Sequence, residues 1–119
     1  PRGHYLYLTG AKRLEELPSV NHPVVRSHPL TGDSAIYVND GFVANIVELS
    51  KVEGNALLTM LYDIVAYSVD FHCRVKWEPN TVVFWDNRIV QHRAVFDYWP
   101  QLRRGYRVTI EGEAPIPTG

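Results

Sequence analysis

The chain has 119 residues, 45% of them hydrophobic, and its 12 Lys and Arg against 13 Asp and Glu give a formal net charge of -1. This length supports one hydrophobic core and hardly more than one domain. The near-neutral charge excludes a global field that would attract nucleic acid or an acidic membrane, which favours a small-molecule partner. Cys73 is the single cysteine, so a disulfide framework is excluded, and with neither a signal-peptide pattern nor a bilayer-spanning apolar run the sequence predicts a soluble, cytoplasmic protein.

The first twenty residues predict a loop or lid segment and an arm. Residues 5–9 have the composition of a short strand, and residues 11–17 form one turn of helix at best before Pro18. The chain begins at Pro1 without a methionine. We therefore expect it to be a fragment of a longer protein.

Residues 21–34, NHPVVRSHPLTGDS, are interrupted by His, Pro and Gly and predict an ordered loop or crossing arm. Ala35 to Val38 alternate and predict a strand that ends at a turn. Ser50 and Glu53 have the S-x-x-E spacing of a capping box, which predicts a helix from about Lys51 to Tyr67. The apolar residues of this helix recur at three and four positions and predict a packing face: Leu57, Met60, Leu61, Ile64 and Val65.

The second half changes to the period of a β-strand. Residues 71–77 alternate, with Phe71, Cys73, Val75 and Trp77 on the face expected to be buried. Residues 81–85, 88–94 and 104–110 predict three further strands, and residues 114–119 a terminal tail. Short strands joined by turns, with one helix packed across them, indicate a mainly β fold of the sandwich or jelly-roll type.

Three arginines in or beside the strand predicted at 104–110 carry the most chemical information. Arg103 and Arg107 are four residues apart, so in a strand they share a face that Arg104 does not. Buried guanidinium groups need compensation. From spacing alone they either pair with internal carboxylates such as Asp86 or Asp97, or bind an anionic ligand through their planar forks.

The five histidines are ambiguous when each is taken alone. His92 lies in a predicted strand and, by itself, is a residue satisfied by an ordinary hydrogen bond. His22 and His28 are expected to cap or brace the Pro-rich loop, and His72 to face solvent.

Several motifs, in order and at nearly the expected gaps, resemble one known family. HPVVRSHPLTGDSAIYVNDGF, WDNRIVQH and DYWPQLRRGYRVTIEGE are similar to the C-terminal half of the Fe(II)- and 2-oxoglutarate-dependent dioxygenases of the taurine dioxygenase (TauD/TfdA) family. The resemblance runs over residues 21–113, which it implies are the C-terminal part of one double-stranded β-helix, or jelly-roll, domain.

The resemblance also assigns roles. His92 matches the distal histidine ligand of Fe(II). Arg103, eleven positions later, matches the arginine that binds the co-substrate 2-oxoglutarate, and Arg107 one that holds a substrate anion. Phe42 matches an aromatic residue of the substrate pocket, and Trp85 a residue close to the metal.

The sequence departs from the family pattern in two ways. Non-haem iron of this class is bound by two histidines and one carboxylate, and the family supplies two of them from an H-x-D or H-x-E motif. No histidine of this chain is followed two positions later by an acidic residue, so we expect that motif upstream in the parent protein. The arginine pair is also displaced by one position, which leaves Arg104 as an alternative to Arg103.

Three functions are compatible with these observations. The resemblance implies a dioxygenase that uses O2 to hydroxylate a small, anionic substrate, an alkyl sulfonate such as taurine or a sulfate ester, with release of succinate and CO2. The alternatives are a non-catalytic jelly-roll module that binds a small anion, and a β-sandwich interaction protein in which the arginines form ion pairs. Family members commonly form homo-oligomers, which the sequence leaves open.

Overall fold

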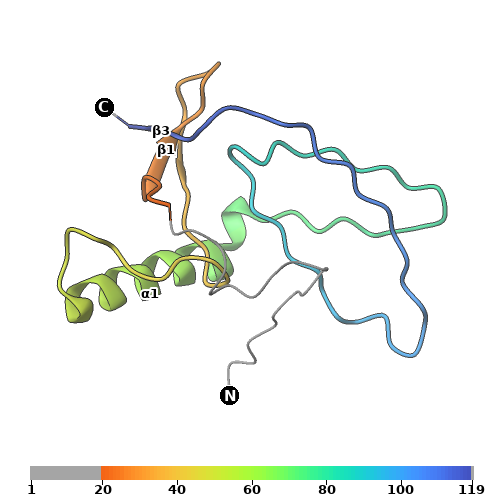
Figure 1. The fold of residues 1–119 in the computed structure, drawn as a ribbon. Helices are drawn as coiled ribbons and strands as arrows, with labels where there is room; N and C mark the ends of the chain where they lie inside the picture. The colour runs from red at the N-terminus through yellow and green to blue at the C-terminus, as the bar shows by residue number, and fades with distance from the viewer. Residues whose placement is uncertain (1–19, 119) are drawn as a thin grey trace.

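A computed structural model describes residues 20–118 (Figure 1). The elements in chain order are β1 (Val25–Ser27), β2 (Ser34–Ile36), helix α1 (Lys51–Tyr67), the 3-10 turn η2 (Val69–Phe71) and β3 (Ile116–Pro117). The strand and the lid predicted within residues 1–19 lie outside the described residues.

The three strands form one small antiparallel sheet in the order β2-β1-β3. Arg26 is the centre of the pairing, because it lies opposite Ala35 of β2 and opposite Pro117 of β3. The sheet therefore joins residues from the two ends of the described chain, and Figure 1 shows the C-terminal end next to β1.

Two of these strands were not expected from the sequence. β1 lies inside the segment predicted as a loop, where Pro23 and Pro29 flank the strand without interrupting it. β3 lies in the segment predicted as a tail, and its Pro117 is at an edge of the sheet, where a residue without an N–H is tolerated. The strand predicted at 35–38 is confirmed as β2, displaced by one or two residues.

Helix α1 has the bounds that the sequence predicts. The Ser50 hydroxyl accepts a hydrogen bond from the backbone N–H of Glu53, and the Glu53 carboxylate accepts one from the backbone N–H of Ser50. These contacts complete a capping box and satisfy amide groups that would otherwise lack partners at the helix start. Among residues 20–118, no helix is both long and apolar enough to cross a bilayer.

The core lies between one face of α1 and the chain that leads into it. Leu58 and Leu61 of the helix are buried together with Val38 and Ile46. The predicted packing face is only partly correct, because Met60 is 51% exposed. The face of the helix that packs on the core carries Leu57, Leu58, Leu61 and Tyr62 instead.

The four strands predicted in the second half are not formed within residues 20–118. Residues 71–77, 81–85, 88–94 and 104–110 contain no ladder pairing, and Figure 1 shows them as long excursions beside α1 and the small sheet. The expected inward residues Phe71 and Cys73 are exposed. The jelly roll is therefore not confirmed, and what is present is one helix with a three-stranded antiparallel sheet.

The reason for this difference is that alternation predicts the faces of a strand but does not supply its neighbour. A strand is defined by hydrogen bonds to another strand, and the described residues offer these four segments no such partner. Large apolar side chains on these segments, and on the chain between the last two of them, remain exposed: Phe71, Val82, Phe84, Phe96, Trp99, Leu102, Tyr106, Val108 and Ile110.

We predict that Leu58→Ala lowers the free energy of unfolding by about 2–5 kcal/mol, because Leu58 is 4% exposed and its loss leaves a cavity in the core. Met60→Ala on the same helix is the matched control and should change stability by no more than about 0.5 kcal/mol. Equilibrium urea unfolding measures both. Equal losses in the two variants would contradict the assigned core.

Candidate functional site

His92 and Trp85 form the centre of the candidate site. Their ring centroids are 4.6 Å apart with an interplanar angle of 54°. The indole is itself held, because its Nε1–H donates to the Asn87 side-chain oxygen at 2.7 Å. His92 is exposed, so its imidazole is packed on one side and accessible to a ligand on the other.

The residue before His92 connects this segment to the sheet. The Gln91 side-chain NH2 donates to the backbone carbonyls of Ile36 and Val38 at 3.2 and 3.1 Å. β2 is an edge strand, and its outward carbonyls would otherwise have no partner in the sheet. Gln91 therefore holds the backbone next to His92 against β2.

Asp86 begins a tight turn between Trp85 and His92. Its Oδ1 accepts hydrogen bonds from the backbone N–H and the Nε–H of Arg88, both at 2.9 Å, and its Oδ2 accepts from Arg88 Nη2 at 2.7 Å. These side-chain and backbone donors of Arg88 hold the pKa of the Asp86 carboxyl well below its usual range. The turn is therefore stabilised by a charged pair two residues apart.

His28 joins this turn to β1. The backbone N–H groups of Leu30 and Thr31 donate to His28 Nδ1 at 3.3 and 3.2 Å, so the hydrogen of the ring lies on Nε2. Nε2 is 3.2 Å from Asp86 Oδ2 and donates to it. The prediction that His28 caps the Pro-rich loop is confirmed, and its second contact reaches a residue 58 positions away.

Arg103 lies against aromatic rings. Its guanidinium carbon is 5.9 Å from the ring centroids of both Trp77 and Tyr98, within reach of a cation–π interaction. Of the carboxylates considered as its partners, Asp97 pairs instead with Arg74, and Asp86 is occupied as described above. Arg103 forms no ion pair with any residue of 20–118.

Arg104 and Arg107 are exposed and are likewise without a carboxylate partner in the described part of the chain. Because the segment is not paired as a strand, its backbone does not test whether Arg103 and Arg107 share a face. Phe42 lies on an exposed turn, 83% accessible, where the Asn39 side-chain oxygen accepts the backbone N–H of Gly41 and of Phe42. It does not join His92 in a common pocket here.

The described residues do not form a complete metal site. Within 20–118, no three His, Cys, Asp or Glu side chains gather in a way that could hold a metal ion. His92 is a suitable single ligand, since a neutral imidazole binds iron. The described residues thus fit the metal as the donor of one ligand.

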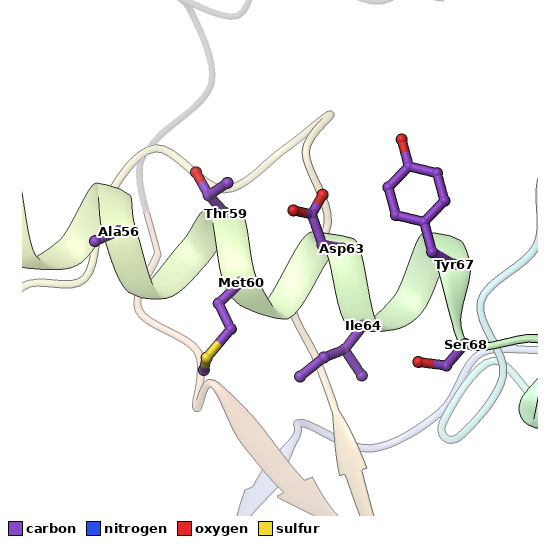
Figure 2. A pocket seen from close by; sticks show the side chains of 7 residues that line it. All are labelled: Ala56, Thr59, Met60, Asp63, Ile64, Tyr67 and Ser68. Atoms are coloured by element: carbon purple, nitrogen blue, oxygen red, sulfur yellow. The ribbon is translucent and has the colours of Figure 1, made fainter.

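One open hollow on the surface of the described residues is unrelated to the candidate site. It is an open depression along α1 (Figure 2), where Thr59, Asp63 and Tyr67 point to one side and Met60 and Ile64 to the other. The predicted site residues His92, Arg103, Arg107 and Phe42 do not line it.

The sequence analysis did not identify Gln91, His28 and Arg88 as neighbours of the candidate site. One local signal was present for Arg88. In a D-x-R sequence such as residues 86–88, the aspartate side chain can accept a hydrogen bond from the backbone N–H of the residue two positions later. The contacts of His28 and Gln91 join positions more than 50 residues apart, and no local pattern predicts such pairs.

Comparison with known proteins confirms the family resemblance noted in the sequence. A family model described as "Taurine catabolism dioxygenase TauD, TfdA family" matches residues 4–109. The chain is 44% identical over 108 residues to an alpha-ketoglutarate-dependent sulfonate dioxygenase of Saccharomyces cerevisiae, covering 90% of this chain and 26% of the relative. It is 40% identical over 95 residues to an alpha-ketoglutarate-dependent sulfate ester dioxygenase of Pseudomonas putida, covering 80% of this chain and 31% of the relative.

A third relative is named an alkylsulfatase, from Acinetobacter baylyi, and is 37% identical over 98 residues, which are 82% of this chain and 30% of that protein. The chain thus spans about a quarter to a third of the length of these relatives.

We predict that Asp86→Asn destabilises the protein at pH 7 and has a smaller effect at pH 3. A carboxyl whose pKa is lowered by folding contributes stability above its unfolded pKa, about 3.9, and that contribution is lost as pH falls toward the lower folded pKa. Urea unfolding at both pH values measures the difference. Asp63→Asn, on the open face of α1, is the control, and an equal pH dependence in both variants would contradict the assignment.

Proposed function

Because this chain belongs to the taurine dioxygenase TauD/TfdA family, we propose that the protein is an Fe(II)- and 2-oxoglutarate-dependent dioxygenase. It hydroxylates a small anionic organic substrate and releases succinate and CO2. The observation that carries the proposal is His92, packed on Trp85 and held to β2 through Gln91, with Arg103 and Arg107 following in the same stretch of sequence.

His92 donates one imidazole ligand to the metal. Packing against Trp85 limits the rotation of its ring, and the Gln91 contacts limit the movement of its backbone. A ligand that is oriented before the metal arrives loses less conformational entropy on binding. When bound, Fe(II) supplies the activation of dioxygen that the hydroxylation requires.

The arginines bind the anions. Arg103 presents a fork of N–H donors that suits the far carboxylate of 2-oxoglutarate, and its position against Trp77 and Tyr98 holds the fork without using a carboxylate partner. Arg107 is free of internal ion pairs among residues 20–118. It is available for the anionic group of the substrate, while Phe42 provides an apolar wall.

The substrate is an alkyl sulfonate or a sulfate ester. The support is the identity of this chain to relatives named for sulfonate and for sulfate ester dioxygenation, together with a free guanidinium at Arg107. Both substrate types present a tetrahedral sulfur group whose oxygens match the donors of an arginine. Hydroxylation at the carbon beside that group would release sulfite or sulfate and leave an aldehyde.

The remaining ligands come from sequence outside this chain. No histidine here has an acidic residue two positions later, and the chain spans 26% of its sulfonate dioxygenase relative. We propose that the H-x-D segment belongs to the same complete protein. The extended segments then complete the jelly roll by pairing with strands from that part, which would cover the apolar residues that are exposed here.

We predict that His92→Ala reduces succinate formation to the level without enzyme, because one of three metal ligands is lost. The complete protein is assayed with Fe(II), 2-oxoglutarate and oxygen across taurine, longer alkyl sulfonates, alkyl sulfate esters and aryl-oxy acids. His22→Ala, at an exposed histidine that packs only edge-on against Tyr37, should retain activity. No turnover by wild type with any compound would favour a non-catalytic anion-binding module.

We predict that Arg103→Gln raises the KM for 2-oxoglutarate by roughly 10- to 100-fold, the equivalent of losing about 1.5–3 kcal/mol of charged hydrogen bonding. Arg107→Gln should raise the KM for the sulfur-containing substrate instead. Arg104→Gln is the matched control and should change neither. Steady-state kinetics with each substrate varied in turn separates the three, and a 2-oxoglutarate effect at Arg104 alone would shift the register by one residue.

A further inference from the structure

A charge network connects three segments that lie far apart in the sequence. Arg26 and His28 are two residues apart on and just after β1, so both side chains lie on one side of the strand. They meet Asp86 and Arg88, from the turn before His92, and Glu113, from the end of the segment that carries the three arginines.

Glu113 is the bridge of this network. Its Oε1 is 3.8 Å from Arg26 Nη2 and 3.6 Å from Arg88 Nη1. Arg88 in turn holds Asp86, which accepts the hydrogen of His28. The positive charges of two guanidinium groups therefore balance the negative charges of two carboxylates. The network begins at Arg26 in β1 and ends at His28, just after the same strand.

The burial of Arg26 explains why the network is needed. This residue is 3% exposed, and within residues 20–118 its Nε and Nη2 atoms make no hydrogen bond. A buried guanidinium is costly unless a charge or a polarisable group compensates it. Here the compensation is Glu113 on one side and the ring of Tyr37, with its centroid 5.1 Å away, on the other.

The network fixes both ends of the candidate site against the same strand. His92 is six residues after Asp86, and Arg107 is six residues before Glu113. Neither segment is held by strand pairing in the described part of the chain. Side-chain contacts to β1, and those of Gln91 to β2, are therefore what sets their relative position.

We propose that Arg26, His28, Asp86, Arg88 and Glu113 act as positioning residues, which hold the metal-ligand segment and the arginine segment at a fixed separation. This inference rests on the proposed function, since it assigns those segments to metal and anion binding. This role requires no contact of the five residues with a substrate or the metal. Their effect is exerted through His92, Arg103 and Arg107.

The test compares Glu113→Gln with Glu78→Gln in the complete protein. Both changes remove one carboxylate charge from an ion pair with little change in shape, but the Glu78 pair with Lys76 is exposed, 3.7 Å long and outside the network. Three measurements are made on each variant: the melting temperature, the affinity for Mn(II) by calorimetry, and steady-state turnover, which gives kcat and the ratio of succinate to hydroxylated product.

We expect Glu113→Gln to raise the ratio of succinate to product above that of wild type and to lower kcat by roughly 10- to 100-fold, as a displacement of reacting groups by about 1 Å does. Mn(II) binding should weaken as well. Glu78→Gln should match wild type in all three measurements. Arg88→Lys should raise the ratio of succinate to product by a smaller amount, because an ammonium group keeps the positive charge but not the planar fork of donors.

A purely structural role has a different signature. The positioning inference is wrong if Glu113→Gln lowers the melting temperature while the ratio of succinate to product and the Mn(II) affinity stay at the wild-type values. Wild type that binds Mn(II) but forms no succinate would contradict the proposed function. The positioning inference would then be decided by whether Glu113→Gln binds Mn(II) more weakly than Glu78→Gln and wild type do. Absence of Mn(II) binding by wild type would overturn both.

Discussion

The arrangement of the candidate site depends on one carboxylate, that of Asp86. It accepts hydrogen bonds from the backbone and the side chain of Arg88 and from His28. The local pair with Arg88 shapes the turn, and the contact with His28 attaches that turn to β1. Because Arg88 also approaches Glu113, the same carboxylate is linked to the segment that follows the arginines. A small sheet of three short strands can thereby organise segments that make no ladder with it.

Such a scaffold differs from the usual way in which a β protein holds a site. Strands normally position side chains through continuous backbone pairing. In residues 20–118 the pairing is confined to β1, β2 and β3, and the segments that carry His92 and the arginines are held by side chains instead. Their exposed apolar residues and unpaired backbone form a surface of the kind that a partner covers. In the proposed function, that partner is the part of the same protein that supplies the H-x-D segment.

Aromatic contacts give the site a second level of order. Trp85 supports His92 and Trp77 lies beside Arg103, so an imidazole and a guanidinium are each oriented by a ring rather than by a charge. This matters for an anion-binding arginine, because a carboxylate partner would compete with the ligand. The two carboxylates considered as partners of these arginines, Asp86 and Asp97, are occupied by Arg88 and Arg74. Among residues 20–118, the distribution of ion pairs thus leaves Arg103 and Arg107 without a carboxylate partner.

The sequence by itself determined the features that depend on neighbouring residues. Helix α1, its capping box at Ser50 and the strand at β2 follow from patterns within a few positions, and the family follows from motifs that survive in order along the chain. Only the tertiary structure decided which face of α1 is buried, that β1 pairs with β3, that His28 contacts Asp86, and that Gln91 contacts the backbone at β2. The physical reason is that these contacts join residues distant in the sequence, more than 50 positions apart for His28, Gln91 and the pairing of β1 with β3. Alternation and spacing specify a side chain's direction but not the group that it meets. The strands predicted after residue 70 show the same limit, since a β pattern becomes a strand only when a second strand accepts its hydrogen bonds.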